Sequence, residues 1–192
     1  IRLITLDVKF NAPECLLMKR ESAKKEPIVL PSTGKEVQVY KYGYSKTRIL
    51  LVHGWAGRGT QLYHLADKIL ENKMMVVSFD APAHGISDGK RTNMLEFIEA
   101  IRLIEKKYGP FDAAVGHSFG GMSLINAVAG GLKVNKLVTL GADNSIPEIF
   151  SYYVYKMELK PDIARRLKRR FEKKYNLRLD HFTSEHQAER IK

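Results

Sequence analysis

A serine flanked by two glycines carries the strongest chemical signal in the sequence. Residues 116–120 read Gly-His-Ser-Phe-Gly and lie between an apolar run typical of a strand and one typical of a helix. At such a turn the strained backbone lifts the serine hydroxyl, here that of Ser118, clear of the sheet, where it can attack a carbonyl carbon. The N–H of Phe119, at the positive end of the helix, could stabilise the resulting oxyanion.

A second glycine turn follows another apolar run. Residues 48–52 read Arg-Ile-Leu-Leu-Val and lead directly into His53-Gly54-Trp55. Acyl transfer needs two hydrogen-bond donors aimed at the developing oxyanion, and a His-Gly turn at a strand end can present the N–H of Trp55 as the second donor. The alternative is a plain strand-to-loop junction. The two turns occur together and in the right order, which favours the catalytic interpretation.

The elements that would position these turns alternate along the chain. Residues 1–10 alternate as a strand does, whereas residues 11–34 are polar, contain three prolines and predict a loose connection. After them the apolar pattern predicts strands at 37–42, 48–52, 74–79, 111–115 and 136–140 and helices at 60–71, 93–107 and 122–129. Strands separated by helical segments imply βαβ units and a parallel sheet. Beyond residue 145 the pattern indicates helix alone.

Composition limits the class of protein. The chain has 192 residues, 44% hydrophobic and 28% charged, as in an ordinary globular domain that buries a core without disulfides. The single cysteine, Cys15, excludes an internal disulfide, and no paired Cys/His cluster predicts a zinc site. No apolar run reaches the ~18–20 residues that span a bilayer, and the N-terminus lacks the order of a secretory signal. We therefore expect a cytoplasmic protein without a metal or an organic cofactor.

Positive charge is concentrated toward the C-terminus. The net charge is +11, and its densest part is the run from Arg165 to Lys174. Such a run can mark a surface that binds nucleic acid or an anionic membrane. The sequence favours a simpler interpretation, the solvated face of an amphipathic helix, because Ile163, Leu167 and Phe171 recur at spacings of four residues.

Three segments resemble those of the α/β-hydrolase superfamily, in particular of a group of mostly uncharacterised bacterial members. They are His53–Gln61, Phe79–Ser87 and Gly116–Gly121, within a resemblance that runs from about residue 37 to residue 140. The resemblance implies a doubly wound, mostly parallel sheet of the α/β-hydrolase type, a nucleophile at Ser118 and oxyanion donors at Trp55 and Phe119. A serine at the turn argues against the dehalogenase and epoxide-hydrolase branches, which place an aspartate there.

The sequence departs from the family pattern at its end. The family continues with two more strands, the first followed by the acid of the catalytic triad and the second by its histidine. Here the chain stops at Lys192, where the next of these strands would begin, and it does not start with methionine. The expectation is a hydrolase core at 1–144, a helical cap at 145–192 over the Ser118 end of the sheet, and a native protein longer by ~50–70 residues. The strand at 136–140 would then be an open edge prone to self-association.

Candidates for the catalytic acid and base within the chain are weaker. Asp143 occupies a position where some superfamily members keep the acid, although a role for Asp143 and Asn144 as caps of the next helix is favoured. His181 and His186 follow Ser118 in the chain order of a base but fall in the helical region. Three further histidines are expected to brace turns rather than to transfer protons: His53, His84 and His117.

The leading hypothesis is a serine hydrolase that cleaves an ester or a related small-molecule acyl substrate through Ser118. Without its base, the 192-residue chain alone is expected to be inactive. The alternative is a catalytically silent hydrolase-fold module that binds nucleic acid or a membrane surface through the basic helix at 165–174. An apolar face of the cap is expected to shape the acyl pocket, built from Ile146, Ile149, Phe150, Tyr153, Val154, Ile163, Leu167 and Phe171.

Overall fold

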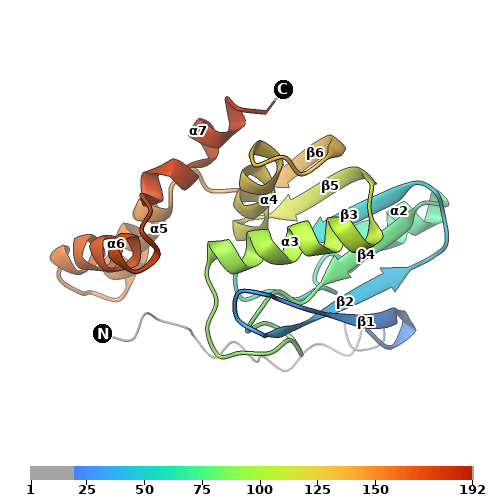
Figure 1. Cartoon of the computed structure of the whole chain (residues 1–192), viewed down its shortest axis with the longest axis horizontal. Helices are drawn as coiled ribbons and strands as arrows, with labels where there is room; N and C mark the ends of the chain where they lie inside the picture. Colours follow the sequence, from blue (N-terminus) through green and yellow to red (C-terminus); the bar gives the residue numbers. More distant parts are fainter. Residues whose placement is uncertain (1–19, 192) are drawn as a thin grey trace.

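The computed structural model describes residues 20–191, so the strand expected at 1–10 lies outside the described part of the chain. Six strands form one sheet in the order β1-β2-β4-β3-β5-β6 (Figure 1). Their bounds are β1 Lys24–Val29, β2 Glu36–Tyr42, β3 Arg48–Val52, β4 Met75–Phe79, β5 Phe111–His117 and β6 Val134–Leu140. Strands β3 to β6 run parallel, and β1 and β2 form an antiparallel pair that joins the sheet at β4. This is the mostly parallel sheet that the sequence predicts.

Helices cover both faces of this sheet. α2 (Tyr63–Glu71) packs on one face, and α3 (Met94–Tyr108) and α4 (Phe119–Ala129) pack on the other (Figure 1). Strand β3 serves both layers, because Leu50 and Val52 join the core under α3 and α4, whereas Ile49 and Leu51 join the core under α2. Successive side chains of a strand point to opposite faces, so a strand covered on both sides is apolar throughout.

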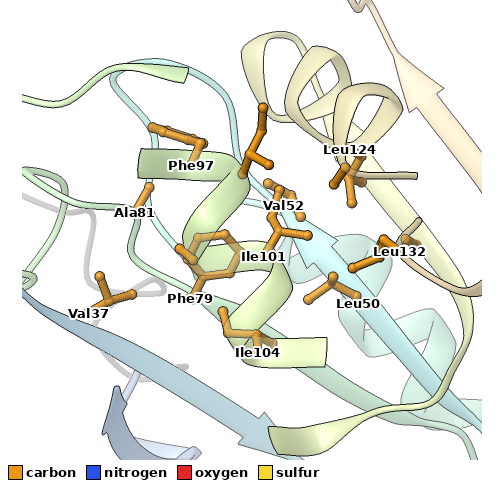
Figure 2. Packing of buried hydrophobic residues seen from close by; sticks show 14 of the residues in the cluster. Val37, Leu50, Val52, Phe79, Ala81, Phe97, Ile101, Ile104, Leu124 and Leu132 are labelled. Carbon is orange, nitrogen blue, oxygen red and sulfur yellow. The ribbon is translucent and has the colours of Figure 1, made fainter. Parts of the chain in front are cut away.

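The main core lies between the sheet and α3. Phe79 of β4 and Phe97 and Ile101 of α3 are fully buried there (Figure 2). Burying a side chain of this size contributes about 1.5–3 kcal/mol. α3 begins after Asn93, whose side chain accepts hydrogen bonds from two N–H groups of the first helical turn. This packing fixes the start of α3 at the carboxyl end of the parallel strands, the end at which Ser118 lies.

Strand β1 corrects the expectation of a loose connection over residues 11–34. It pairs with β2, with Pro27 opposite Gln38, and proline is tolerated there because, within the described residues, β1 forms an edge of the sheet. Lys107 and Lys41 bind the Glu26 carboxylate at 2.6 and 2.9 Å and lower its pKa to about 2. Pairing with β2 and ion pairs stabilise this strand. The hydrophobic pattern of the sequence indicates burial, so it did not predict a strand here.

Helical elements follow the sheet. They are α5 (Ile146–Lys156), α6 (Asp162–Tyr175), the 3-10 helix η1 (Leu179–Phe182) and α7 (Ser184–Ala188). They lie beyond the carboxyl ends of the parallel strands, at the end of the sheet where Ser118 lies (Figure 1). Leu179 is buried in the main core, and the side chain of Asn126 in α4 donates to the Phe182 carbonyl at 3.1 Å. The segment is thus anchored to the core on the side that a cap would occupy.

The apolar face expected for this segment points inward only in part. Ile146 and Val154 are buried, but Tyr153 is 45% exposed and does not belong to the buried face. Three other members pack against the main core: Ile149, Phe150 and Phe171. The role of this face in an acyl pocket stays a prediction.

The cap of α5 is Ser145, not Asp143 or Asn144. The Ser145 hydroxyl accepts from the Glu148 N–H at 3.4 Å. Asn144 instead accepts from the Glu185 N–H in the first turn of α7 at 3.0 Å, and Asp143 accepts from the N–H of its neighbour Asn144 at 2.9 Å. Three consecutive residues with short polar side chains precede α5, and only the one at the helix boundary has the geometry of a cap.

Strand β6 forms one edge of the described sheet. Within residues 20–191 it pairs with β5 alone. Leu137 packs against the main core, whereas Val138 and Leu140 are 45% and 42% exposed. In this part of the chain the strand has the open edge that the sequence led us to expect. Exposed apolar edge strands favour pairing with another chain, and self-association through β6 stays a prediction.

Candidate active site

Ser118 stands at a strained turn between β5 and α4. β5 ends at His117 and α4 begins at Phe119. The Ser118 φ of 50° and ψ of −120° lie in a region that residues other than glycine rarely adopt, at a cost of about 1–3 kcal/mol. The Ser118 N–H donates to the Leu140 carbonyl of β6 at 2.8 Å, which holds the turn. The strand–turn–helix context that the Gly-His-Ser-Phe-Gly motif predicts is present.

Two loops leave the sheet at the same end as Ser118. The β3 loop comprises residues 53–61, and the β4 loop comprises residues 80–88. Because β3 and β4 are adjacent parallel strands, the loops that follow them lie side by side. Their side chains and N–H groups therefore determine the surroundings of the serine.

Glycines allow the β3 loop to pack directly on the Ser118 turn. A Cβ placed on Gly120 would lie 2.4 Å from the His53 carbonyl oxygen. A Cβ placed on Gly54 would lie 3.0 Å from the Cβ of Ser118. The Gly120 contact is closer than real Cβ atoms come to backbone atoms, and the Gly54 contact is tighter than most real Cβ contacts, so glycine at these positions lets the two turns pack together.

Two N–H groups in the turns that meet at Ser118 have no acceptor among residues 20–191. The N–H of Phe119 is in the first turn of α4, where helix N–H groups lack partners within the helix. The N–H of Trp55 follows Gly54 in the β3 loop. Within residues 20–191 neither group donates to a protein acceptor. Paired donors of this kind are what a developing oxyanion requires.

Two buried histidines cross-link the β3 and β4 loops reciprocally. His53 of the β3 loop accepts at Nε2 from the Ala81 N–H of the β4 loop, at 2.9 Å. His84 of the β4 loop accepts at Nε2 from the Ala56 N–H of the β3 loop, at 3.2 Å. The two ring centroids are 5.1 Å apart. Each loop therefore supplies the acceptor that holds the backbone of the other.

Both rings are neutral and carry their proton on Nδ1. The Nδ1 of His53 donates to the Gly54 carbonyl at 2.7 Å, and the Nδ1 of His84 donates to the Pro82 carbonyl at 2.9 Å. Each Nε2 faces an N–H and must be an acceptor. Burial lowers the pKa of His53 to about 3 and also lowers the pKa of His84. The expectation that these two histidines brace turns is confirmed.

Asp80 is the residue of the site whose role the sequence did not reveal. Its carboxylate is 2% exposed and accepts three hydrogen bonds, from the Tyr40 hydroxyl (2.8 Å), the Gly59 N–H (2.7 Å) and the Ile86 N–H (2.9 Å). Burial and the neighbouring carboxylate raise the pKa of Tyr40. The carboxylate thus joins both loops to β2. An acidic residue directly after an apolar strand is the signal that could have pointed to it, because a buried charge needs partners.

Four aromatic rings form a closed set of edge-to-face contacts beside the serine. The Phe119 ring contacts those of Trp55 and Phe97, at centroid distances of 5.2 and 5.1 Å. The His84 ring contacts the same two rings, at 5.5 Å each. Such pairs contribute about 0.5–1.5 kcal/mol each beyond burial. The side chains of the two candidate donor residues are therefore locked to each other and to α3.

The candidates for acid and base are not assembled around the serine. Within residues 20–191 no side chain makes a hydrogen bond with the Ser118 hydroxyl. Asp143 accepts from the N–H that follows it, and the exposed His181 and His186 pack on each other with ring centroids 5.5 Å apart. The Nδ1 of His117 is buried and has no hydrogen-bond partner among the described residues.

The basic run lies on α6, and α6 is an amphipathic helix. Phe171 packs against the main core, whereas Arg166 pairs with Asp162 at 2.8 Å and Lys168 with Asp180 at 2.7 Å. The solvated helix face favoured from the sequence is present, and binding of an anionic partner to it stays a prediction. Across residues 20–191, no helix is long and apolar enough to cross a membrane, and no three His, Cys, Asp or Glu residues are grouped to hold a metal ion.

A family model for the alpha/beta hydrolase fold matches residues 47–185, which is most of the chain. The chain belongs to the alpha/beta hydrolase fold family. The matched region contains the β3 loop, the β4 loop and the Ser118 turn. Family membership and the geometry around Ser118 therefore depend on the same part of the molecule.

Solved structures of this hydrolase fold resemble the chain at low sequence identity. A carboxylesterase from the thaumarchaeon Nitrososphaera gargenis is 16% identical, with a TM-score of 0.61 over 69% of this chain and 52% of that one. An esterase from Pyrococcus furiosus is 17% identical, with a TM-score of 0.58 over 81% and 63% of the two chains. Mouse alpha/beta hydrolase domain-containing protein 10 is 14% identical, with a TM-score of 0.61 over 88% and 71%.

These likenesses show the fold. The chain spans about half the length of the carboxylesterase, at 52%. No curated protein matches the sequence.

Proposed function

We propose that the protein is a serine hydrolase that cleaves an ester or a related acyl substrate through an acyl-enzyme at Ser118. The observation that carries the proposal is the strained Ser118 turn in contact with the β3 loop, with the N–H groups of Trp55 and Phe119 free beside it. A backbone strain of this kind persists where the surrounding structure enforces it, and it clusters at active sites. The similar fold of a carboxylesterase and an esterase supports the same class of reaction.

The proposed reaction follows from these groups. The Ser118 oxygen attacks the substrate carbonyl carbon while a general base takes the hydroxyl proton. The carbonyl oxygen becomes an oxyanion that accepts from the N–H groups of Trp55 and Phe119. The base returns the proton to the leaving alcohol as the ester bond breaks, and water then hydrolyses the acyl-enzyme by the same route. The described residues place no base at Ser118, so the proposal assigns this part to a histidine–carboxylate pair beyond them.

A fluorophosphonate probe tests the proposal on the full-length protein. Such a probe reacts with activated serines, so wild type should be labelled and the Ser118→Ala variant should not. Ser151→Ala is the matched control, because Ser151 is exposed on α5 and bonds only within its own helix. Equal labelling of wild type and Ser118→Ala would show that Ser118 is not the nucleophile.

The alternative function predicts a different result in the same preparation. A catalytically silent module would take up no probe and would bind RNA or anionic vesicles through residues 165–174. That binding would weaken steeply between ~50 and 200 mM salt. The test therefore separates the two functions.

A further inference from the structure

The direction of the Trp55 N–H is set by the carbonyl of the same peptide group. The Gly54 carbonyl and the Trp55 N–H belong to one planar trans peptide, in which the two bonds point in opposite directions. The carbonyl oxygen accepts from the Nδ1 of His53 at 2.7 Å and from the Gly57 N–H at 3.1 Å. His53 is 1% exposed and is itself tied to the β4 loop. Holding this oxygen fixes where the N–H points.

The next peptide group is held from the opposite loop. The Ala56 N–H donates to the Nε2 of His84 at 3.2 Å, and Ala56 has a φ of 62°, which a non-glycine residue keeps only when it is constrained. His84 is 5% exposed, and its Nδ1 is anchored on the Pro82 carbonyl. Both peptide groups that flank the Cα of Trp55 are therefore held by an imidazole, one from each loop.

The His84 ring has little freedom to move. It makes edge-to-face contacts with the rings of Trp55 and Phe97, each at 5.5 Å between centroids. The titratable groups that face it are His53, at 5.1 Å, and Asp80, whose carboxylate is already bound by three donors. Packing fixes the ring position, and the Nδ1 bond fixes the tautomer that leaves Nε2 as an acceptor.

We propose that His84 is a positioning residue that holds the Trp55 N–H in the orientation in which it binds the oxyanion. The proposal rests on the function proposed above, because the Trp55 N–H is one of the two oxyanion donors in that reaction. His84 acts through the Ala56 N–H and the Trp55 ring. A side chain at position 84 preserves this arrangement if it presents an acceptor where Nε2 lies, and it releases the β3 loop if it does not.

Two variants separate the two ring nitrogens. The amide of His84→Gln reaches the position of Nε2 and can accept from the Ala56 N–H. The shorter amide of His84→Asn reaches the position of Nδ1, so it can keep the bond to the Pro82 carbonyl but not the bond to Ala56. The readouts are kcat and KM for a p-nitrophenyl ester, the affinity for a phenylboronic acid that mimics the oxyanion, and the amide exchange rate of Ala56.

His84→Asn should lower kcat by ~10–100-fold, less than the ~10²–10³-fold cost of losing a whole oxyanion donor, while KM changes by less than about threefold. It should weaken boronic acid binding to a similar extent, since transition-state analogues report interactions made in the transition state. The Ala56 amide should exchange faster. His84→Gln should stay within about fivefold of wild type in every readout.

Equal impairment of the two variants would overturn the proposal. So would a faster Ala56 exchange in His84→Asn with unchanged kcat and boronic acid affinity, because the residue would then be structural only. If His84→Asn does not fold, failure of His84→Gln to restore wild-type kcat overturns it instead. Fluorophosphonate labelling of the wild type distinguishes these results from failure of the proposed function. An unlabelled wild type would refute the hydrolase. The Ala56 exchange rate would still decide whether His84 holds the β3 loop.

Discussion

The Asp80→Asn variant tests whether the Asp80 carboxylate holds both the β3 loop and the β4 loop in place. Asparagine has the same shape but presents an NH2 donor where one acceptor oxygen was. Oδ1 of Asp80 accepts from the Gly59 N–H, and Oδ2 accepts from the Tyr40 hydroxyl and the Ile86 N–H. Whichever way the amide is turned, its NH2 meets a backbone N–H, and two donors cannot bond to each other.

The expected loss in the free energy of unfolding follows from these three hydrogen bonds. With the amide oxygen at the Oδ2 position, the Gly59 N–H loses its acceptor, and a buried unsatisfied donor costs about 1–3 kcal/mol. The two remaining bonds change from charge-assisted to neutral, a loss of about 1 kcal/mol each. Removing a buried charge offsets part of this sum. We therefore expect Asp80→Asn to lower the free energy of unfolding by about 2–4 kcal/mol.

Urea unfolding of matched variants measures this effect. Asp88→Asn is the control, because Asp88 lies on the same loop, is exposed, and its carboxylate accepts one hydrogen bond, from the Glu36 N–H at 3.0 Å. We expect the control to lose less than about 1 kcal/mol. Asp80→Asn should also slow fluorophosphonate labelling of Ser118, since the β3 loop loses its anchor at Gly59. Equal losses in the two variants, or a wild-type stability for Asp80→Asn, would refute the reasoning.

Three further predictions concern the Ser118 turn, the buried histidines and the sheet edge. Gly120→Ala places a Cβ 2.4 Å from the His53 carbonyl oxygen and should lower the free energy of unfolding in urea by about 3 kcal/mol or more. The control Gly131→Ala has nothing within 4 Å but a φ of 99°, and it should lower this free energy by about 1 kcal/mol. Equal losses would contradict the close approach. Lowering the pH from 7 to 5 should destabilise the protein, because the unfolded chain protonates His53 near pH 6.5 while the folded pKa is about 3. The unfolded state then binds more protons, so His53 alone removes about 2 kcal/mol by pH 5, and a flat pH dependence of unfolding would count against a buried neutral ring. Val138→Lys on the exposed β6 edge should reduce self-association in sedimentation experiments. The control Tyr155→Lys adds the same charge to exposed α5 and should not reduce it. A wild type that stays monomeric would contradict edge pairing.

The parallel core and the Ser118 turn could be predicted because their signals are local. The apolar run at 48–52 reports burial on both faces of β3, and glycines at fixed offsets from Ser118 report the sharp turn. The same turns pointed to the N–H groups of Trp55 and Phe119 as donors, and the family resemblance implied the same two residues. Each of these inferences depends on residues close together in the chain.

The anchor at Asp80 could not be predicted in the same way. Its donors come from β2, the β3 loop and the β4 loop, and they converge only because β2 lies beside β4 in the sheet. Neither hydrophobic periodicity nor turn chemistry encodes that neighbour relation. The strand β1 was missed for a related reason, since pairing with β2 stabilises it and Ile28 is the one buried residue of the strand. The capping role of Ser145 depended on the boundary residue of α5, and boundaries are the least certain part of a sequence-based prediction.

The place of β2 beside β4, and not beside its neighbour in sequence β3, also constrains the order of folding. A two-stranded hairpin such as β1–β2 is marginally stable by itself in water, so it depends on pairing with β4. The Tyr40 hydroxyl reaches Asp80 only when β2 has paired with β4, so the anchor of the β3 and β4 loops forms after that pairing. In the folded protein the anchor therefore depends on the β2–β4 contact, at which Val39 and Tyr40 of β2 are buried. Release of the hairpin at this contact would unfasten Asp80 and loosen both loops while the helices and the inner strands stay folded.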